Sequence, residues 1–152
     1  MTYIIRAASA KDAATIAPLL READKRELDA MCGLSPLDAL LYSIRTSKEA
    51  WIACRPDGHP LMICGVGEDQ DVGIPWMLGT DELKRYGKSL VKDGRVFVNR
   101  WTDKYGMLTN YVDARNTVHI DWLTLMGFDV ILADEYIGHD KSVPFLLFYR
   151  SN

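Results

Sequence analysis

The sequence predicts an α/β (α+β) fold: a mixed sheet of six to seven strands flanked by about four helices, in the order β-α-α-β-β-β-α-β-α-β-β. Two periodicities predict it. Short runs that alternate apolar and polar residues indicate strands, and longer runs with apolar residues every three or four positions indicate helices. With 152 residues, 48% of them apolar, the chain can bury a substantial core. We therefore expect a single domain over residues 1–152.

Each element has its own local signal. The runs expected to form strands are residues 3–7, 51–54, 61–66, 74–78, 107–112, 130–133 and 144–149. The runs expected to form helices are residues 9–27, a segment that starts at 35, residues 82–93, and residues 117–126, with residues 95–105 as a possible continuation of the third helix.

The boundaries between these elements carry typical capping and turn residues. Ser9 is a good N-cap, and Asp12 follows three positions later as in a capping box. Ser35-Pro36 places a cap and then a proline at the first helical position. Pro56-Asp57-Gly58 is a strong hairpin signal, and the acidic residues 68–71 read as a loop.

The run from Leu108 to Phe128 combines a strand, a turn and a capped helix. Asn116 stands where an N-cap is expected. Gly127 stands where a left-handed residue ends a helix, and Phe128 can fold back on Leu123 as in a Schellman motif. The helix is therefore predicted to close at Gly127.

Composition excludes several classes of protein. The net charge of −3 gives no basic footprint for nucleic acid. No apolar run approaches the ~20 residues that span a bilayer, and residues 1–9 read as a strand rather than a signal peptide. Cys32, Cys54 and Cys64 cannot all pair, so we expect buried reduced thiols. These features point to a cytoplasmic protein without a metal site.

The element order, Val112-x-x-x-Asn116 and Gly127-Phe128 together resemble the Gcn5-related N-acetyltransferase (GNAT) superfamily. Within it, residues 75–80 and 110–116, with Trp122-Leu123 ahead of Gly127, are most similar to acetyltransferase-like internal virion or core proteins of short-tailed bacteriophages. The resemblance covers nearly the whole chain. It also accounts for Pro75 in a central strand, because the fourth strand of that fold bulges and splays from the fifth.

The resemblance implies an acyl-CoA-dependent N-acetyltransferase that transfers an acetyl group from acetyl-CoA to an amine of a protein or small molecule. It places the cofactor on Met77, Leu78, Gly79, Thr80, Lys84, Arg85 and Asn116. The family's Arg/Gln-x-x-Gly-x-Gly/Ala phosphate loop is missing. Asp81 and Glu82 instead occupy the helix start, where they suit the helix dipole but oppose a pyrophosphate. Residues 85–88 could be a displaced remnant of the loop.

The catalytic residues implied are Tyr111, Glu27 and His119. Each has a structural alternative: Tyr111 and His119 could simply be packed side chains, and Asp24 with Glu27 could be a solvated helix end. Asp113 is a further alternative. The family's usual tyrosine acid, seven positions after the motif asparagine, is replaced here by Leu123.

These departures leave a second hypothesis open. The chain could be a catalytically degenerate GNAT-fold phage protein that acts by binding a host or phage protein, in virion morphogenesis or host targeting. It would then be found in the host cytoplasm or in the virion. Coenzyme A binding separates the two hypotheses.

Overall fold

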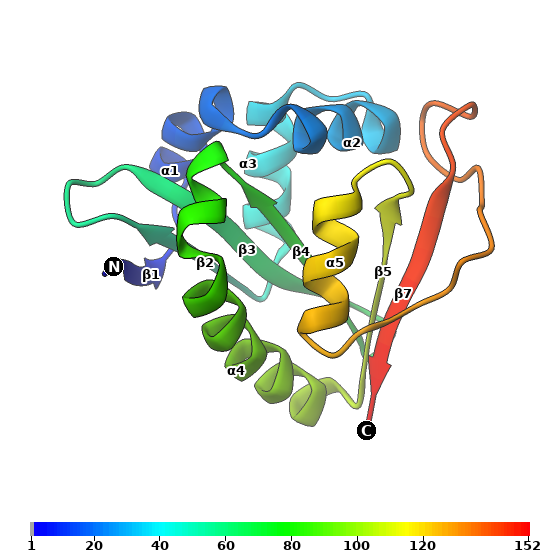
Figure 1. Cartoon of the computed structure of the whole chain (residues 1–152). Helices are drawn as coiled ribbons and strands as arrows, with labels where there is room; N and C mark the ends of the chain where they lie inside the picture. Colours follow the sequence, from blue (N-terminus) through cyan, green and yellow to red (C-terminus); the bar gives the residue numbers. More distant parts are fainter. Residues whose placement is uncertain (1) are drawn as a thin grey trace.

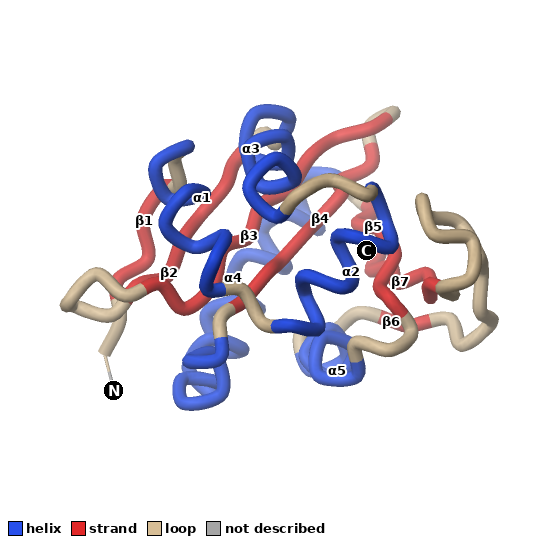
Figure 2. Tube along the Cα trace, turned by 90° about the horizontal axis from the view of Figure 1, so that it is seen from above, coloured by secondary structure: helices blue, strands red, loops and turns tan. Residues whose placement is uncertain are grey.

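A seven-stranded mixed sheet forms the middle of the molecule, and helices cover both of its faces (Figures 1 and 2). The computed structural model describes residues 2–152. The strands lie in the order β1-β2-β3-β4-β5-β7-β6, and every neighbouring pair is antiparallel except β4 and β5. The predicted fold class is confirmed.

The strands are β1 (Ile4–Ala7), β2 (Glu49–Cys54), β3 (Pro60–Asp69), β4 (Val72–Gly79), β5 (Met107–Asp113), β6 (Asp129–Val130) and β7 (Phe145–Ser151). The α-helices are α1 (Ala10–Ile16), α2 (Glu22–Cys32), α3 (Pro36–Thr46), α4 (Gly87–Tyr105) and α5 (Thr117–Leu125). Two 3-10 helices, η1 (Ala17–Leu19) and η2 (Asp81–Tyr86), precede α2 and α4.

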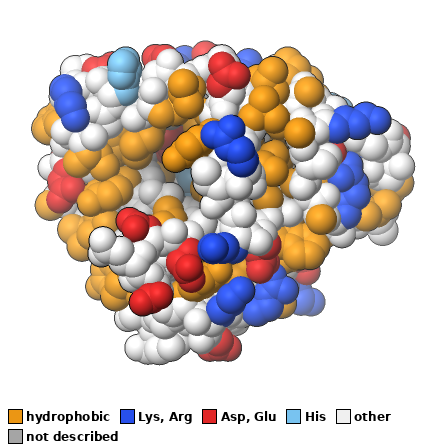
Figure 3. All heavy atoms as spheres, turned by 180° about the vertical axis from the view of Figure 1, so that it is seen from behind, with side chains coloured by type: hydrophobic (Ala, Val, Ile, Leu, Met, Phe, Trp, Pro, Cys, Tyr) orange, Lys and Arg blue, Asp and Glu red, His pale blue; other side chains and the backbone are white. Residues whose placement is uncertain are grey.

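Two apolar clusters fix these layers. One joins α4 and α5 to one face of the sheet and includes Leu61, Leu90, Trp101, Val112 and Leu123. The other joins α1 and α3 to the opposite face and includes Ile16, Leu40, Ile52, Ile63 and Leu78. Figure 3 shows the molecule from behind, where acidic and basic side chains are intermixed with apolar ones.

The first predicted helix, residues 9–27, is in fact three pieces. Pro18 lies in η1, and the chain is extended at Leu20 and Arg21 before α2 begins at Glu22. Proline has no N–H and its ring clashes with the preceding turn, so a continuous helix cannot pass through it. Arg21 to Glu27 therefore start a new helix across the C-terminal ends of β4 and β5 (Figure 1).

Three other boundaries differ from the prediction. The loop predicted over residues 68–71 is only a two-residue turn, because β3 continues through Asp69 and β4 starts at Val72; Gln70 and Asp71 have φ values of 50° and 69°. The helix predicted over 82–93 is η2 followed by α4, and α4 does continue through the uncertain segment 95–105. The strand predicted over 130–133 is only Asp129–Val130.

The end of α5 follows its sequence signal closely. Gly127 has a φ of +94°, its N–H donates to the Thr124 carbonyl, and the Phe128 N–H donates to the Leu123 carbonyl at 3.0 Å. This is the predicted Schellman motif. At the other end Asn116 is the N-cap residue, but its side chain makes no capping hydrogen bond and turns to other partners.

β4 and β5 meet at one point only. Their pairing is confined to Gly73 and Leu108, and the strands then diverge toward their C-terminal ends. Pro75 lies on the diverging side, and its carbonyl accepts a hydrogen bond from Asn110 Nδ2 at 2.9 Å. The predicted break at Pro75 is therefore present, and it opens the sheet in the middle.

Candidate active site

The opening between β4 and β5 exposes backbone groups of every second residue of β4. The Thr80 N–H donates to Leu61 on β3, whereas the Gly79 N–H donates away from β3 to Asp24 Oδ2 at 2.8 Å. Because backbone groups alternate direction along a strand, Met77 faces the opening as Gly79 does. The β4–β5 pairing is confined to Gly73 and Leu108, so it leaves the Met77 N–H and carbonyl without a partner on β5. This peptide group is free to bind a ligand.

A buried polar cluster from α2 closes the far end of the opening. Asp24 Oδ1 accepts from Asn116 Nδ2 at 2.9 Å, and Glu27 Oε1 accepts the Asp113 N–H at 2.9 Å. The Arg21 guanidinium lies 3.3 Å from Asp24 and donates to Asn116 Oδ1 at 3.3 Å. These side chains bind the end of β4 to the end of β5 through α2.

His119 joins this cluster from α5, on the other face of the sheet. Its Nδ1 lies 3.7 Å from Glu27 Oε2, too far for a hydrogen bond, and no other described group pairs with it although the ring is 5% exposed. Burial is the largest influence and lowers the pKa of His119, but the Glu27 and Asp24 carboxylates outweigh it, so the pKa is raised overall. His119 and Glu27 thus face each other beside the end of β5, one able to donate a proton and the other able to accept one.

Asp24 is a buried acid whose pKa is raised. It is 2% exposed, and burial raises its pKa above the ordinary value, while the Arg21 guanidinium and the Gly79 N–H lower it only in part. The cluster therefore combines an acid and an imidazole whose pKa values are both shifted upward, which is typical of functional sites.

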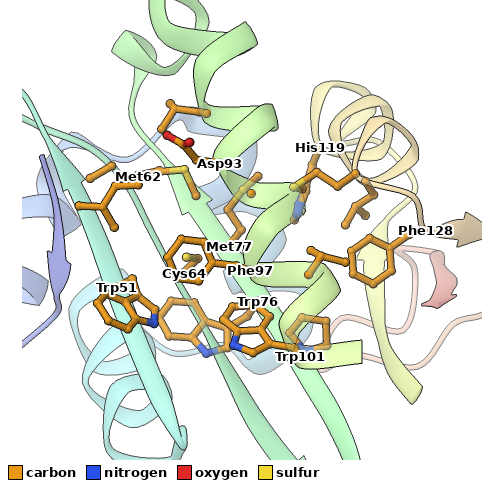
Figure 4. A pocket seen from close by; sticks show the side chains of 18 of the residues that line it. Trp51, Met62, Cys64, Trp76, Met77, Asp93, Phe97, Trp101, His119 and Phe128 are labelled. Carbon is orange, nitrogen blue, oxygen red and sulfur yellow. The ribbon is translucent and has the colours of Figure 1, made fainter. Parts of the chain in front are cut away.

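An apolar cavity of about 70 Å³ adjoins the opening on the side of α4 and α5 (Figure 4). β2, β3 and β4 form its floor, and Phe97 and Trp101 of α4 cover it. Met77 lines it from β4, and His119 lines it from α5. The free Met77 peptide and the His119 ring therefore border the same apolar space.

The junction between β4 and α4 replaces the expected phosphate loop. η2 carries Glu82, whose carboxylate lies 3.6 Å from both Arg55 and Arg85. α4 itself begins at Gly87 and has no acidic residue in its first turn. Lys88 is its second residue. A Cβ at Gly87 would lie 3.6 Å from Trp122, so the start of α4 lies against α5. Residues 85–88 thus lie across the junction of η2 and α4, where the Gly87 N–H donates to the Lys84 carbonyl.

The structure brings together only part of the predicted set. Glu27, His119 and Asn116 lie in one cluster, Met77 and Gly79 face the opening, and Lys84 and Arg85 lie on the exposed η2. Two predicted cofactor residues are placed differently from the expectation. Leu78 pairs with β3 and packs on the far face. Thr80 is 1% exposed, and its hydroxyl is bonded to the Pro60 and Leu61 carbonyls.

Tyr111, the third predicted catalytic residue, lies apart from the pair. Its ring packs on Ala30, Val143 and Phe145, and it makes no side-chain hydrogen bond with Glu27 or His119 in the described part of the chain. This placement fits the packing alternative for Tyr111. Asp113 is also buried, but Arg115 engages its carboxylate at 2.6 Å.

Sequence reasoning missed Arg21 and Asn110. Arg21 sits three positions before Asp24, which sits three before Glu27, so a helix start just before residue 22 would have put all three on one face. Asn110 was visible only as a polar residue in the middle of a strand. Its role as a bridge to Pro75 depends on a partner 35 positions away.

Within the part of the chain that the structure describes, the cysteines, the metal-ligating side chains and the apolar helices give no further site. The three cysteines are all free; Cys32 is exposed, against the expectation, while Cys54 is buried and Cys64 half-buried. No group of three or more His, Cys, Asp or Glu side chains suited to a metal ion occurs in residues 2–152. None of the described helices is long and apolar enough to cross a membrane.

Comparison with known proteins decides the fold. No protein-family model matches the sequence, and no curated protein matches it. Solved structures match nearly end to end. An N-acetyltransferase from Staphylococcus aureus Mu50 superimposes with a TM-score of 0.72 at 14% identity, covering 99% of each chain. The chain has the GNAT fold.

Two further structures with the GNAT fold agree. A Gcn5-related N-acetyltransferase from Kribbella flavida has a TM-score of 0.69 at 18% identity, covering 99% of this chain and 98% of its own. A phosphinothricin acetyltransferase from Sinorhizobium meliloti, solved in complex with acetyl-CoA, has a TM-score of 0.70 at 13% identity, with coverages of 99% and 89%. At such identities the similarity establishes the fold, and the activity has to be argued from the site.

Proposed function

We propose that this protein is an acyl-CoA-dependent N-acetyltransferase that transfers an acetyl group from acetyl-CoA to a primary amine. The β4–β5 opening carries the proposal. There the Met77 N–H and carbonyl lack partners on β5, and the Glu27–His119 pair stands at the rim. Acetyl-CoA supplies an acetyl thioester when bound. The free peptide and apolar lining fit an amide-containing, largely apolar arm.

The residues of the opening divide the chemistry between them. The Met77 N–H is placed to donate to a thioester carbonyl oxygen as negative charge grows on it. Glu27 Oε2 accepts no hydrogen bond from the described residues and can take the proton that the amine must lose. His119, whose pKa is raised, is the donor that returns a proton to the leaving thiolate. As the C–N bond forms and the C–S bond breaks, both protons are thus accounted for.

The start of α4 completes the proposed cofactor site. A helix N-terminus favours a pyrophosphate, and Arg85 and Lys88 flank this one. The two arginines beside Glu82 offset its charge, so the acidic residues of η2 oppose an anion less than the sequence suggests. Arg85, with its side chain 63% exposed, is free to move from Glu82 to a phosphate.

Binding of acetyl-CoA to the full chain is the direct test. At ~100 times its dissociation constant it should stabilise the fold by about 2.7 kcal/mol, which raises the Tm of a chain this long by about 5–10 °C. Removing two charges with Arg85→Gln and Lys88→Gln should weaken binding roughly tenfold. The matched control, Lys25→Gln with Arg26→Gln on α2, should leave it unchanged.

Activity is tested separately by coenzyme A release with a panel of amines. Glu27→Gln and His119→Gln should each lower kcat while acetyl-CoA still binds. Absence of both heat and thermal shift at millimolar acetyl-CoA would overturn the proposal.

That negative result would favour the second candidate, a GNAT-fold protein that works by binding a host or phage protein. One observation supports this candidate: Asp24 already occupies the Gly79 N–H, the next β4 donor facing the opening. The resemblance of residues 75–80 and 110–116 to internal virion proteins of short-tailed phages would place such a protein in the virion or the host cytoplasm.

A further inference from the structure

The cavity beneath α4 is lined almost entirely by apolar side chains. Its volume is about 70 Å³. Among the residues that line it, Asp93 is the only carboxylic acid and His119 the only imidazole. The Tyr3 hydroxyl already donates to the Asp93 carboxylate, and Glu27 faces His119. The remaining wall offers a ligand hydrocarbon contacts rather than hydrogen bonds.

The walls are also adaptable. Met62, Met77 and Met126 contribute flexible thioether side chains, which fill irregular space and repack with little loss. Gly94 of α4 leaves room where any side chain would meet Met126, since a Cβ there would lie 2.7 Å from its sulfur. Such walls suit a ligand group of variable shape.

Met77 connects the cavity to the proposed reaction site. Its backbone N–H faces the β4–β5 opening, and its side chain lines the cavity. A thioester carbonyl held by that N–H therefore has its substituent beside the cavity. His119 and Leu123 line the same space from α5, so the cavity extends from β4 to α5.

We propose that the cavity holds the aliphatic chain of the acyl donor, and that the preferred donor carries a short acyl group of about three to five carbons rather than acetyl. The inference rests on the proposed acyl-CoA-dependent function. A cavity of ~10–15 Å³ on this measure already holds one water-sized group, so about 70 Å³ has room for the one to three carbons by which such a chain exceeds acetyl.

Affinity across a chain-length series tests this. Each buried methylene should tighten binding about fourfold. Calorimetry on the full chain with coenzyme A and its acetyl, propionyl, butyryl and octanoyl esters should show butyryl-CoA binding on the order of tenfold more tightly than acetyl-CoA. Octanoyl-CoA should bind less tightly than butyryl-CoA, because its chain exceeds the cavity.

Two variants assign the preference to the cavity. Cys64→Leu fills it from β3 and should bring butyryl-CoA down to the affinity of acetyl-CoA. The same change at the exposed Cys32, outside the cavity, should preserve the preference. If Cys64→Leu does not fold, Val98→Ala enlarges the cavity from α4 and should move the optimum to a longer chain.

The outcomes separate the two proposals. Equal affinities for all esters, or a preference that Cys64→Leu and Val98→Ala both leave unchanged, would overturn the cavity assignment and leave the transferase proposal standing. Failure of coenzyme A and every ester to bind would overturn both.

Discussion

Replacing Glu27 by glutamine tests whether a charge pair crosses the β4–β5 opening. Glu27 Oε1 accepts a hydrogen bond from the Asp113 N–H at 2.9 Å. The amide oxygen of glutamine can accept the same bond, but without the negative charge of the carboxylate. Hydrogen bonds to charged groups contribute about 1.5–3 kcal/mol and neutral ones about 0.5–1.5 kcal/mol. The bond alone therefore accounts for a loss of about 1 kcal/mol, or about 2–4 °C in Tm for a chain of this length.

His119 makes this loss depend on pH. In the wild type its pKa is raised above the ordinary 6.5, so its stabilising contribution is full below pH 6.5 and is lost as the pH rises through the folded-state pKa. Removing the Glu27 charge removes the main influence that raises this pKa and leaves burial, which lowers it, so the pKa of His119 should fall in the variant. The variant therefore loses stabilisation that the wild type has at low pH, and the loss is smaller at high pH, where the His119 of the wild type is neutral as well.

Urea unfolding followed by tryptophan fluorescence at pH 5.5, 6.5, 7.5 and 8.5 measures the effect. The difference in unfolding free energy between wild type and Glu27→Gln should widen steadily toward pH 5.5. Glu22→Gln, the same change on the exposed side of α2, should give a small loss that does not vary with pH. A constant difference for Glu27→Gln across this range would refute the charge pair, as would an NMR titration that leaves the His119 pKa unmoved.

Three further substitutions probe the frame of the site. Asn116→Asp places a carboxylate 2.9 Å from Asp24, and should lower the unfolding free energy by about 2–4 kcal/mol at pH 7 and less at pH 5, measured by urea denaturation at both pH values; equal losses would show that charge is not the cause. Asn110→Ala removes the bond to the Pro75 carbonyl and should cost about 1 kcal/mol, with faster hydrogen exchange in β5 as the readout. Gly127→Ala forces a side chain onto a φ of +94° and should cost about 1–2 kcal/mol in thermal unfolding; an unchanged Tm would contradict the Schellman assignment.

Features with a local cause were predictable from the sequence. Gly127 and Phe128 close α5 as expected, because a glycine that can adopt the left-handed conformation and an apolar residue directly after it can both be recognised in the sequence. The break in the sheet was expected from the resemblance to the GNAT superfamily. Pro75 is compatible with that break, because a residue without an N–H cannot pair with both neighbours of a central strand, but an edge strand would have explained it as well. The order of the elements along the chain followed from the two periodicities, whereas the mixed sheet was expected from the resemblance to the GNAT superfamily.

The candidate site was less predictable because its contacts are long-range. Asp24 and Asn116 are 92 positions apart, and nothing in either segment names the other as partner. Asn116 has the residue type of an N-cap, but its side-chain amide donates to the buried acids instead of capping α5. The charged run 21–27 looks like a solvated helix end, and only the interruption at Pro18 turns its acids inward.

The side chains that close the β4–β5 opening are polar, and this helps to distinguish the transferase from the binding protein. A fold that only needed to seal the gap between β4 and β5 could do so with apolar side chains, because buried ion clusters are often no more stabilising than a packed apolar replacement. Here Asp24 and Glu27 are instead buried among polar partners, with an imidazole nitrogen that has none. Desolvation of an ionised acid works against folding, and the upward pKa shift of Asp24 is a sign of that penalty. Groups held at such a cost beside a free Met77 peptide are suited to moving protons there, and this favours the transferase over the binding protein.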